Sequence, residues 1–85
     1  MENEKQILKK VRENGMALKY VEDQTEKICM EAVQQNGMAL EFVKDQTEEI
    51  CIEAVRQNPS ALQYVKNKTP EIYRAAGMRD LLQQR

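Results

Sequence analysis

The sequence predicts an all-α domain built from short helical repeats, an α-solenoid-like stack in which helices of about ten and about six residues alternate with a period of 22. Three observations support this class. They are an internal repeat, apolar residues at helical spacing within each copy, and helix-capping residues at the same place in each copy. A length of 85 residues fits a single small domain over residues 1–85 rather than two.

The repeat is visible when the chain is aligned with itself at a shift of 22 residues. Residues 15–36 read GMALKYVEDQTEKICMEAVQQN and residues 37–58 read GMALEFVKDQTEEICIEAVRQN, with 16 of 22 positions identical. Residues 59–76 form a third and more diverged copy, and residues 3–14 match the second half of an earlier one. Self-similarity at a short fixed period indicates stacked repeats.

Each copy contains a longer and a shorter helical segment. The longer one carries an apolar stripe at 3.6-residue spacing, formed in the first full copy by Ile28, Cys29, Ala32 and Val33. Its polar positions are expected to face water: Glu26, Lys27, Glu31 and Gln34. We predict longer helices at 4–13, 26–35, 48–57 and 70–76, and shorter ones at 16–21, 38–43 and 60–65.

The prolines and capping residues support these boundaries. Pro59 and Pro70 each stand at the first position of an expected helix, where proline costs no hydrogen bond. Because Pro59 replaces a glycine of the other copies, that position does not require a positive φ. The expected N-caps are Asn14, Asn36 and Asn58 for the shorter helices, and Asn3, Thr25, Thr47 and Thr69 for the longer ones.

The C-terminal end departs from the repeat. Gly77 stands where the earlier copies have valine, and we expect it to end the last long helix. The segment Met78–Gln84 is amphipathic, so residues 77–85 are predicted to form a capping helix that covers the third copy with Leu81 and Leu82.

Composition excludes several classes of function. The chain has no histidine, which removes the commonest general base and metal ligand. Its formal net charge of −1 lacks the basic excess of a nucleic-acid binder. It has no apolar run of about 20 residues and no secretory signal at its polar N-terminus. We therefore expect no catalysis, no cofactor, no bound metal, no membrane contact and a cytoplasmic location.

Cys29 and Cys51 occupy equivalent positions of neighbouring long helices. Packed helices lie about 8–10 Å apart and equivalent side chains point in parallel, whereas a disulfide needs Cα atoms within about 7 Å. Core packing is therefore favoured over a metal, redox or disulfide role, and reduced thiols suit the cytoplasm. Tyr20, Phe42 and Tyr64 are likewise expected to be core anchors, the alternative being that the tyrosine hydroxyls line the rim of a partner-binding groove.

Charge is distributed unevenly along the chain. The central copies are acidic, whereas the C-terminal part is basic through Lys66, Lys68, Arg74, Arg79 and Arg85. The acidic residues fit a solvated helix face better than carboxylate pairs for acid–base chemistry, which require burial. As a surface for a partner of opposite charge, the candidate residues are Glu26, Glu31, Asp45, Glu48, Glu49 and Glu53.

The repeated pattern resembles a known family. Ala-Leu-x-Tyr/Phe-Val at 17–21 and 39–43, followed by Thr-Glu-x-Ile-Cys-x-Glu-Ala-Val and Gln-Asn-Gly, is similar to a family of short helical repeats of unknown function. The resemblance covers residues 3–76. It implies a helical fold and an origin in large DNA viruses, phages or bacteria, with the host cytoplasm as the location for a viral protein, and it implies no activity.

Two functions remain open on the sequence. The first is a non-catalytic protein–protein interaction module, in a narrower form a phage- or virus-encoded inhibitor of a host defence protein. The second is a structural repeat, natural or designed as a consensus, that assembles with itself, with its basic end against an acidic copy. The partner is thus another protein or a second copy of the chain.

Overall fold

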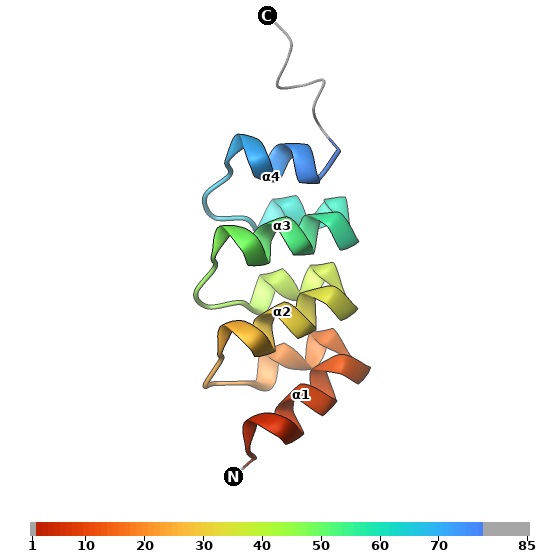
Figure 1. Ribbon diagram of the computed structural model, residues 1–85, viewed down its shortest axis with the longest axis vertical. Helices are drawn as coiled ribbons and strands as arrows, with labels where there is room; N and C mark the ends of the chain where they lie inside the picture. Colours follow the sequence, from red (N-terminus) through yellow and green to blue (C-terminus); the bar gives the residue numbers. More distant parts are fainter. Residues whose placement is uncertain (1, 78–85) are drawn as a thin grey trace, which may run out of the picture.

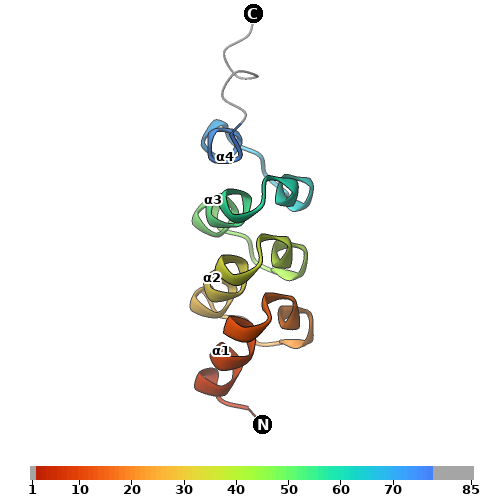
Figure 2. The same cartoon turned by 90° about the vertical axis from the view of Figure 1, so that its right-hand side faces the viewer.

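The computed structural model describes residues 2–77, in which α-helices alternate with 3-10 helices and no strand occurs (Figure 1). The two kinds of helix form two parallel rows along the stack (Figure 2). The α row contains α1 (Glu4–Glu13), α2 (Glu26–Gln35), α3 (Glu48–Gln57) and α4 (Pro70–Ala75). The other row contains η1 (Gly15–Tyr20), η2 (Gly37–Phe42) and η3 (Pro59–Tyr64). The predicted small helical-repeat fold is confirmed.

The predicted helix boundaries need two corrections. The first three long helices match the prediction. The last one, α4, ends at Ala75 rather than at residue 76, and Gly77, two residues after its end, has a φ of 83°. The shorter helices begin one residue earlier than predicted and are 3-10 rather than α. The asparagine caps explain this, since the Asn14 carbonyl accepts a hydrogen bond from the Ala17 N–H at 2.9 Å, an i to i+3 bond that starts the turn at Gly15.

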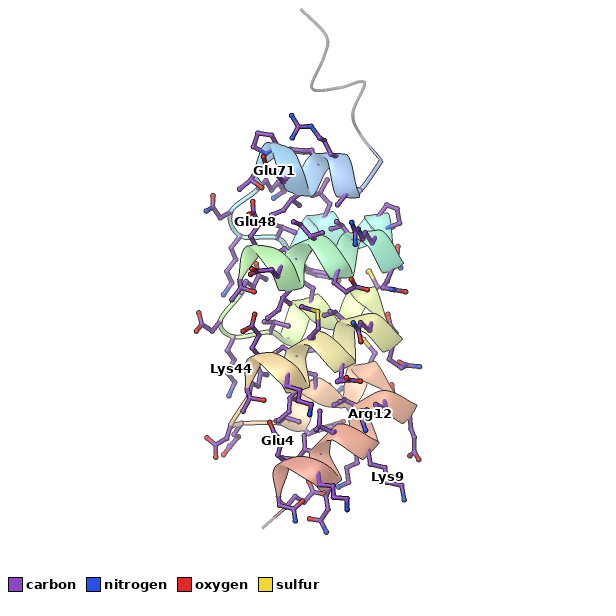
Figure 3. The ribbon with its side chains drawn as sticks, viewed as in Figure 1. Glu4, Lys9, Arg12, Lys44, Glu48 and Glu71 are labelled. Atoms are coloured by element: carbon purple, nitrogen blue, oxygen red, sulfur yellow. The ribbon has the colours of Figure 1, made fainter. Side chains whose placement is uncertain are left out.

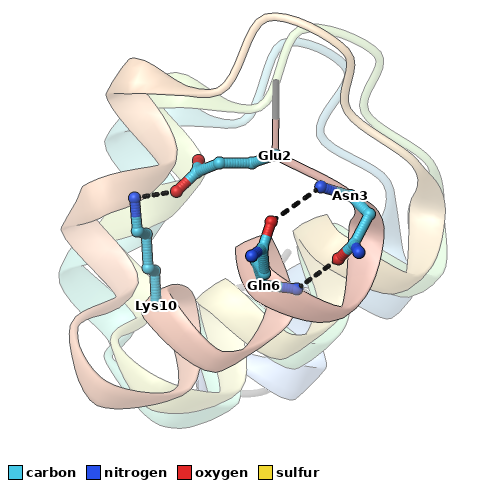
Figure 4. Close-up of polar contacts among 4 residues, drawn as sticks. All are labelled: Glu2, Asn3, Gln6 and Lys10. Carbon is cyan, nitrogen blue, oxygen red and sulfur yellow. Dashed lines mark hydrogen bonds and ion pairs between the residues drawn. The ribbon is translucent and has the colours of Figure 1, made fainter.

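The predicted N-caps are all present. Each threonine cap accepts from the backbone N–H three residues later, as Thr47 does from Ile50 at 3.2 Å. At the N-terminus, Asn3 and Gln6 form a reciprocal capping box, and Lys10 forms an ion pair with Glu2 (Figure 4). Local hydrogen bonds therefore fix where each helix of the stack begins.

The core lies between the two rows. The predicted stripe of α2 is buried, with Ile28, Cys29, Ala32 and Val33 at most 3% exposed. Leu18 and Leu40 of the 3-10 helices fill the space from the other side. The prediction that Tyr20 is a core anchor is wrong, because its side chain is 78% exposed; Phe42 and Tyr64 are half-buried. No 3-10 helix precedes η1 in residues 2–77, so nothing covers Tyr20 from that side.

Two glycines allow neighbouring copies to approach closely. A Cβ at Gly15 would overlap the carbonyl oxygen of Ala32, and one at Gly37 would overlap that of Ala54. Neither glycine has a positive φ, as the proline of the third copy predicted. Pro59 stands at the equivalent place of the third copy and is exposed there. Its side chain is accepted because the next α-helix, α4, ends at Ala75 and is shorter than α2 and α3.

A glutamine in each of the loops before α2 and α3 joins one copy to the next. Gln46 Nε2 donates to the Tyr64 carbonyl at 2.8 Å, and Gln46 Oε1 accepts from the Lys66 N–H at 3.1 Å. Gln24 makes the equivalent bonds to Phe42 and Lys44. These amides satisfy backbone groups that the 3-10 helices leave open where they end.

The first helix of the stack is polar on its outer side. Gln6 and Lys10 are exposed at the positions where α2 has the buried Ile28 and Ala32. The outer side of α1 is therefore suited to contact with solvent rather than with a further helix. The predicted capping helix lies outside the described residues, apart from Gly77. Within residues 2–77 no helix has the length and apolar character needed to cross a membrane.

Candidate interaction surface

The side of the α row that faces away from the 3-10 helices is a continuous helical surface, which we call the outer α face. In each helix its residues recur on the side opposite the buried stripe. In α2 they are Lys27, Met30, Glu31 and Gln34, and in α3 they are Glu49, Ile52, Glu53 and Arg56. α1 contributes Lys5, Lys9 and Arg12, and α4 contributes Glu71, Arg74 and Ala75. Figure 1 views the molecule with this row in front.

Charge changes sign along the outer α face. The second residue of each helix is exposed and belongs to one row across the stack, which we call the N2 row: Lys5, Lys27, Glu49 and Glu71. Two positive charges are thus followed by two negative ones. The sequence prediction placed the basic charge at the C-terminal end and missed this basic half, of which Lys5 and Lys27 are members.

Apolar atoms lie in the middle of the same face. Met30 and Ile52 are half-buried, and each packs with one side against the core. Their other side is part of the surface of α2 and α3, next to Lys27 and Glu49 of the N2 row. The centre of the outer α face is therefore apolar, with charges around it, which is the usual composition of a protein-binding surface.

The six predicted partner-binding residues lie in two places. Glu31, Glu49 and Glu53 belong to the outer α face. The prediction that Glu31 faces water is only partly right, because Glu31 is half-buried and its Oε1 pairs with Arg12 Nε of the preceding helix at 3.0 Å. Glu53 Oε2 accepts from Gln57 Nε2 at 2.8 Å. Glu49 is exposed.

The remaining three, Glu26, Asp45 and Glu48, lie at the edge of the stack where the α-helices begin, as Figure 3 shows for Glu48. Glu48 Oε2 accepts from Thr69 Oγ1 of the next copy at 2.6 Å. Glu4 receives the same bond from Thr25 at 2.9 Å. As the first residues of their helices, these glutamates also stabilise the positive end of the helix dipole. Glu48 therefore has a structural role that explains its recurrence.

The same edge has two equivalent hollows between successive copies, and a cysteine lies at the base of each. The first is lined by Gln24, Cys29 and Asp45, and the second by Gln46, Cys51 and Lys66, among others. Each thiol donates to its glutamine Oε1 at 3.4 Å. Both cysteines are free and buried, as predicted.

Burial raises the pKa of both thiols. For Cys29 the largest cause is desolvation, followed by the negative charges of Asp45 and Glu26. For Cys51 it is desolvation followed by the charge of Glu48. A thiol with a raised pKa stays protonated at neutral pH and is a poor nucleophile. Among residues 2–77, no three aspartate, glutamate or cysteine side chains are grouped so that they could hold a metal ion.

The two central copies differ at positions that share one property. All six differences fall on exposed or half-buried residues. Three of the pairs belong to the outer α face: Lys27/Glu49, Met30/Ile52 and Gln34/Arg56. The other three pairs lie on the 3-10 helices or in the loops after them: Lys19/Glu41, Tyr20/Phe42 and Glu22/Lys44. The identical positions supply the fully buried core, the caps and the glutamine bonds between copies. The contrast between identical and differing positions can be seen in the sequence alone, and it indicates Lys27, Met30 and Ile52 as candidate surface residues.

Two rows of helices, a period of 22 residues and a core shared between copies define an α-helical repeat protein. The chain belongs to the family described as "Domain of unknown function (DUF4116)", whose model matches residues 3–47 and again residues 25–69. The two matches are offset by one repeat. Neither a curated protein nor a solved structure matches the chain.

Proposed function

We propose that this protein is a non-catalytic interaction module that binds a protein partner through its outer α face. One observation carries the proposal: the two central copies are identical at every fully buried position and cap, whereas half of their six differences fall on this face, where Met30 and Ile52 lie among charges. A repeat stack of this kind is a rigid support for such a surface.

The acidic residues contribute to the proposal unequally. Glu49 is the clearest candidate, because it is exposed and its side chain makes no hydrogen bond or ion pair within residues 2–77. Glu31 and Glu53 lie beside it, each with a partner in its own chain. Glu26, Asp45 and Glu48 are less suited to the role, because their edge also carries the contacts that cap the helices.

A narrower form of the proposal is an inhibitor encoded by a phage or virus that occupies a surface of a host defence protein in the host cytoplasm. Small size and a binding surface without catalytic groups are compatible with this form. The resemblance to repeats of viruses, phages and bacteria motivates it. The rival is a structural repeat that assembles end to end, and the exposed Gln6 and Lys10 on the outer side of α1 disfavour a helix packing there.

The test is capture of partners from cells of the native source with a tagged protein. Replacement of Lys27, Met30, Glu49 and Ile52 by alanine is expected to abolish capture while far-UV circular dichroism remains unchanged. The matched control replaces Lys19, Tyr20 and Glu41 of the 3-10 row by alanine and is expected to leave capture intact. Capture that survives the α-face replacements would refute the proposed surface.

A further inference from the structure

We infer that the partner of the outer α face is a second copy of this chain, bound in a two-fold dimer with α2 against α3 and α1 against α4. This inference rests on the proposed function of that face and names its partner. It uses an isologous contact, in which the same surface serves both copies.

The N2 row is self-complementary in charge. Its order along the stack is positive, positive, negative, negative, through Lys5, Lys27, Glu49 and Glu71. A two-fold axis between α2 and α3 reverses this order in the second copy. Lys27 then faces Glu49 of the second copy, and Lys5 faces Glu71. Each dimer contains both contacts twice, so four pairs of opposite charge form at once.

The direction of the helices permits this register. All four α-helices begin at the same edge of the stack, on the side of the connecting loops (Figure 1). A two-fold axis that lies between the two faces and runs parallel to the helices keeps the helix direction. Residues near the start of one helix therefore meet residues near the start of the opposing helix. The N2 row of one copy meets the N2 row of the other over its whole length.

The apolar centre falls on the axis. Met30 of α2 and Ile52 of α3 are equivalent residues of the two central helices. In the proposed register Met30 of each copy meets Ile52 of the other, which buries the exposed side of both. Burial of apolar atoms at the centre with charges around them is the arrangement of a specific interface.

The remaining charges of the face oppose this register less than the N2 row favours it. Glu31 and Glu53 face one another across the axis, and each already has a donor in its own chain, Arg12 and Gln57 respectively. Arg56 meets the neutral Gln34. Within residues 2–77, the exposed ion pair between Arg74 and Glu71, at 3.6 Å, is the contact that competes with this register. Exposed pairs of this kind are weak and easily exchanged.

The isolated stack does not account for the order of charges. Neighbouring helices lie about 8–10 Å apart, so Lys5 beside Lys27 and Glu49 beside Glu71 place like charges next to each other. Alternating charges would suit a single chain better. The lysine pair and the glutamate pair become favourable only when the lysines of one molecule face the glutamates of another.

The test is a pair of complementary variants studied by sedimentation velocity. K5E/K27E makes the N2 row wholly acidic, and E49K/E71K makes it wholly basic. Wild-type protein is expected to be dimeric at about 200 µM, and each variant alone to associate at least about 100-fold more weakly, because all four pairs become like-charge contacts. An equimolar mixture of the two variants is expected to form a one-to-one heterodimer.

The control is K19E/K66E, which changes the net charge as K5E/K27E does at positions away from the outer α face and is expected to dimerise like wild type. Circular dichroism of each variant checks that the helices persist. Wild-type protein that is monomeric at this concentration, or a mixture that stays monomeric, overturns the inference. If the protein is monomeric but captures a different protein through the outer α face, the dimer is refuted and the proposed function stands. If it neither dimerises nor captures another protein through this face, the dimer and the proposed function are both refuted.

Discussion

The interior of the stack and the outer α face differ in what they tolerate. Between the two central copies, the interior is unchanged: Ile28 and Ile50, Ala32 and Ala54, and the loop glutamines recur without variation. On the outer α face the same comparison gives a reversal of charge, from Lys27 to Glu49. The interior therefore determines the fold, and the outer face can change without disturbing it.

The largest difference between the interior and the outer α face is expected when an isoleucine is truncated on each side of α3. Ile50 is 1% exposed, and Ile50→Ala is expected to lower the free energy of unfolding by about 3 kcal/mol, through lost burial and the cavity left behind. Ile52 is half-buried on the outer face, and Ile52→Ala is expected to cost less than about 1 kcal/mol. Urea unfolding measured at low protein concentration gives both values. Equal losses would contradict the division.

A second prediction concerns the close approach between copies. Gly37→Ala is expected to destabilise by about 2–3 kcal/mol, because the new Cβ meets a backbone oxygen of Ala54 that cannot move aside. Pro59→Ala, at the equivalent place in the third copy, is expected to change stability by less than about 1 kcal/mol. Thermal unfolding of the two variants tests this pair. A Gly37 variant as stable as wild type would show that the copies are not held so close.

The glutamine contacts between copies are expected to have a smaller effect. Gln46→Ala leaves the Tyr64 carbonyl and the Lys66 N–H without their partner and is expected to cost about 1–2 kcal/mol. Hydrogen exchange should show faster exchange of the Lys66 amide. Gln63→Ala, an exposed glutamine of η3, serves as the control. Unchanged protection of the Lys66 amide would rule out the proposed role of Gln46.

The smallest expected effect is a dependence on pH. Because burial raises the pKa of both thiols above the ordinary 9.0, the folded state holds these protons more tightly than the unfolded state. Their stabilising contribution is complete below pH 9 and is lost as the pH rises above it. Relative to C29V/C51V, wild-type protein should therefore lose more stability between about pH 8 and pH 10.5. Parallel curves for the two proteins would contradict the raised pKa values.

Much of the fold could be predicted from the sequence because two independent signals coincide. The apolar stripe and the cap before it mark the same boundary, and α2 begins at Glu26 directly after Thr25 for both reasons. The 3-10 character of the shorter helices depends on their i to i+3 hydrogen bonds, such as those donated by the Ala17 and Val21 N–H groups, which composition does not reveal. The exposure of Tyr20 depends on the position of η1 at the beginning of its row.

The candidate surface was harder to predict, because acidic residues serve two purposes in this chain. Glu48 is required at the start of α3, where it accepts from Thr69, whereas Glu49 one residue later faces outward. A list of acidic residues cannot separate these roles. The basic half of the face, Lys5 and Lys27, was missed because charge was summed along the chain rather than around each helix.

The most direct test of the division between interior and outer face is one four-residue variant, with Lys27, Met30, Glu49 and Ile52 replaced by alanine, studied by sedimentation velocity and circular dichroism. We predict that it has the helicity of wild type and no dimer at about 200 µM, and that its free energy of unfolding, measured where wild type is monomeric, is lower by no more than about 2 kcal/mol, because Met30 and Ile52 pack only one side against the core. A variant that unfolds, or one that still forms the wild-type dimer, would contradict the separation of fold and binding on which the proposals rest.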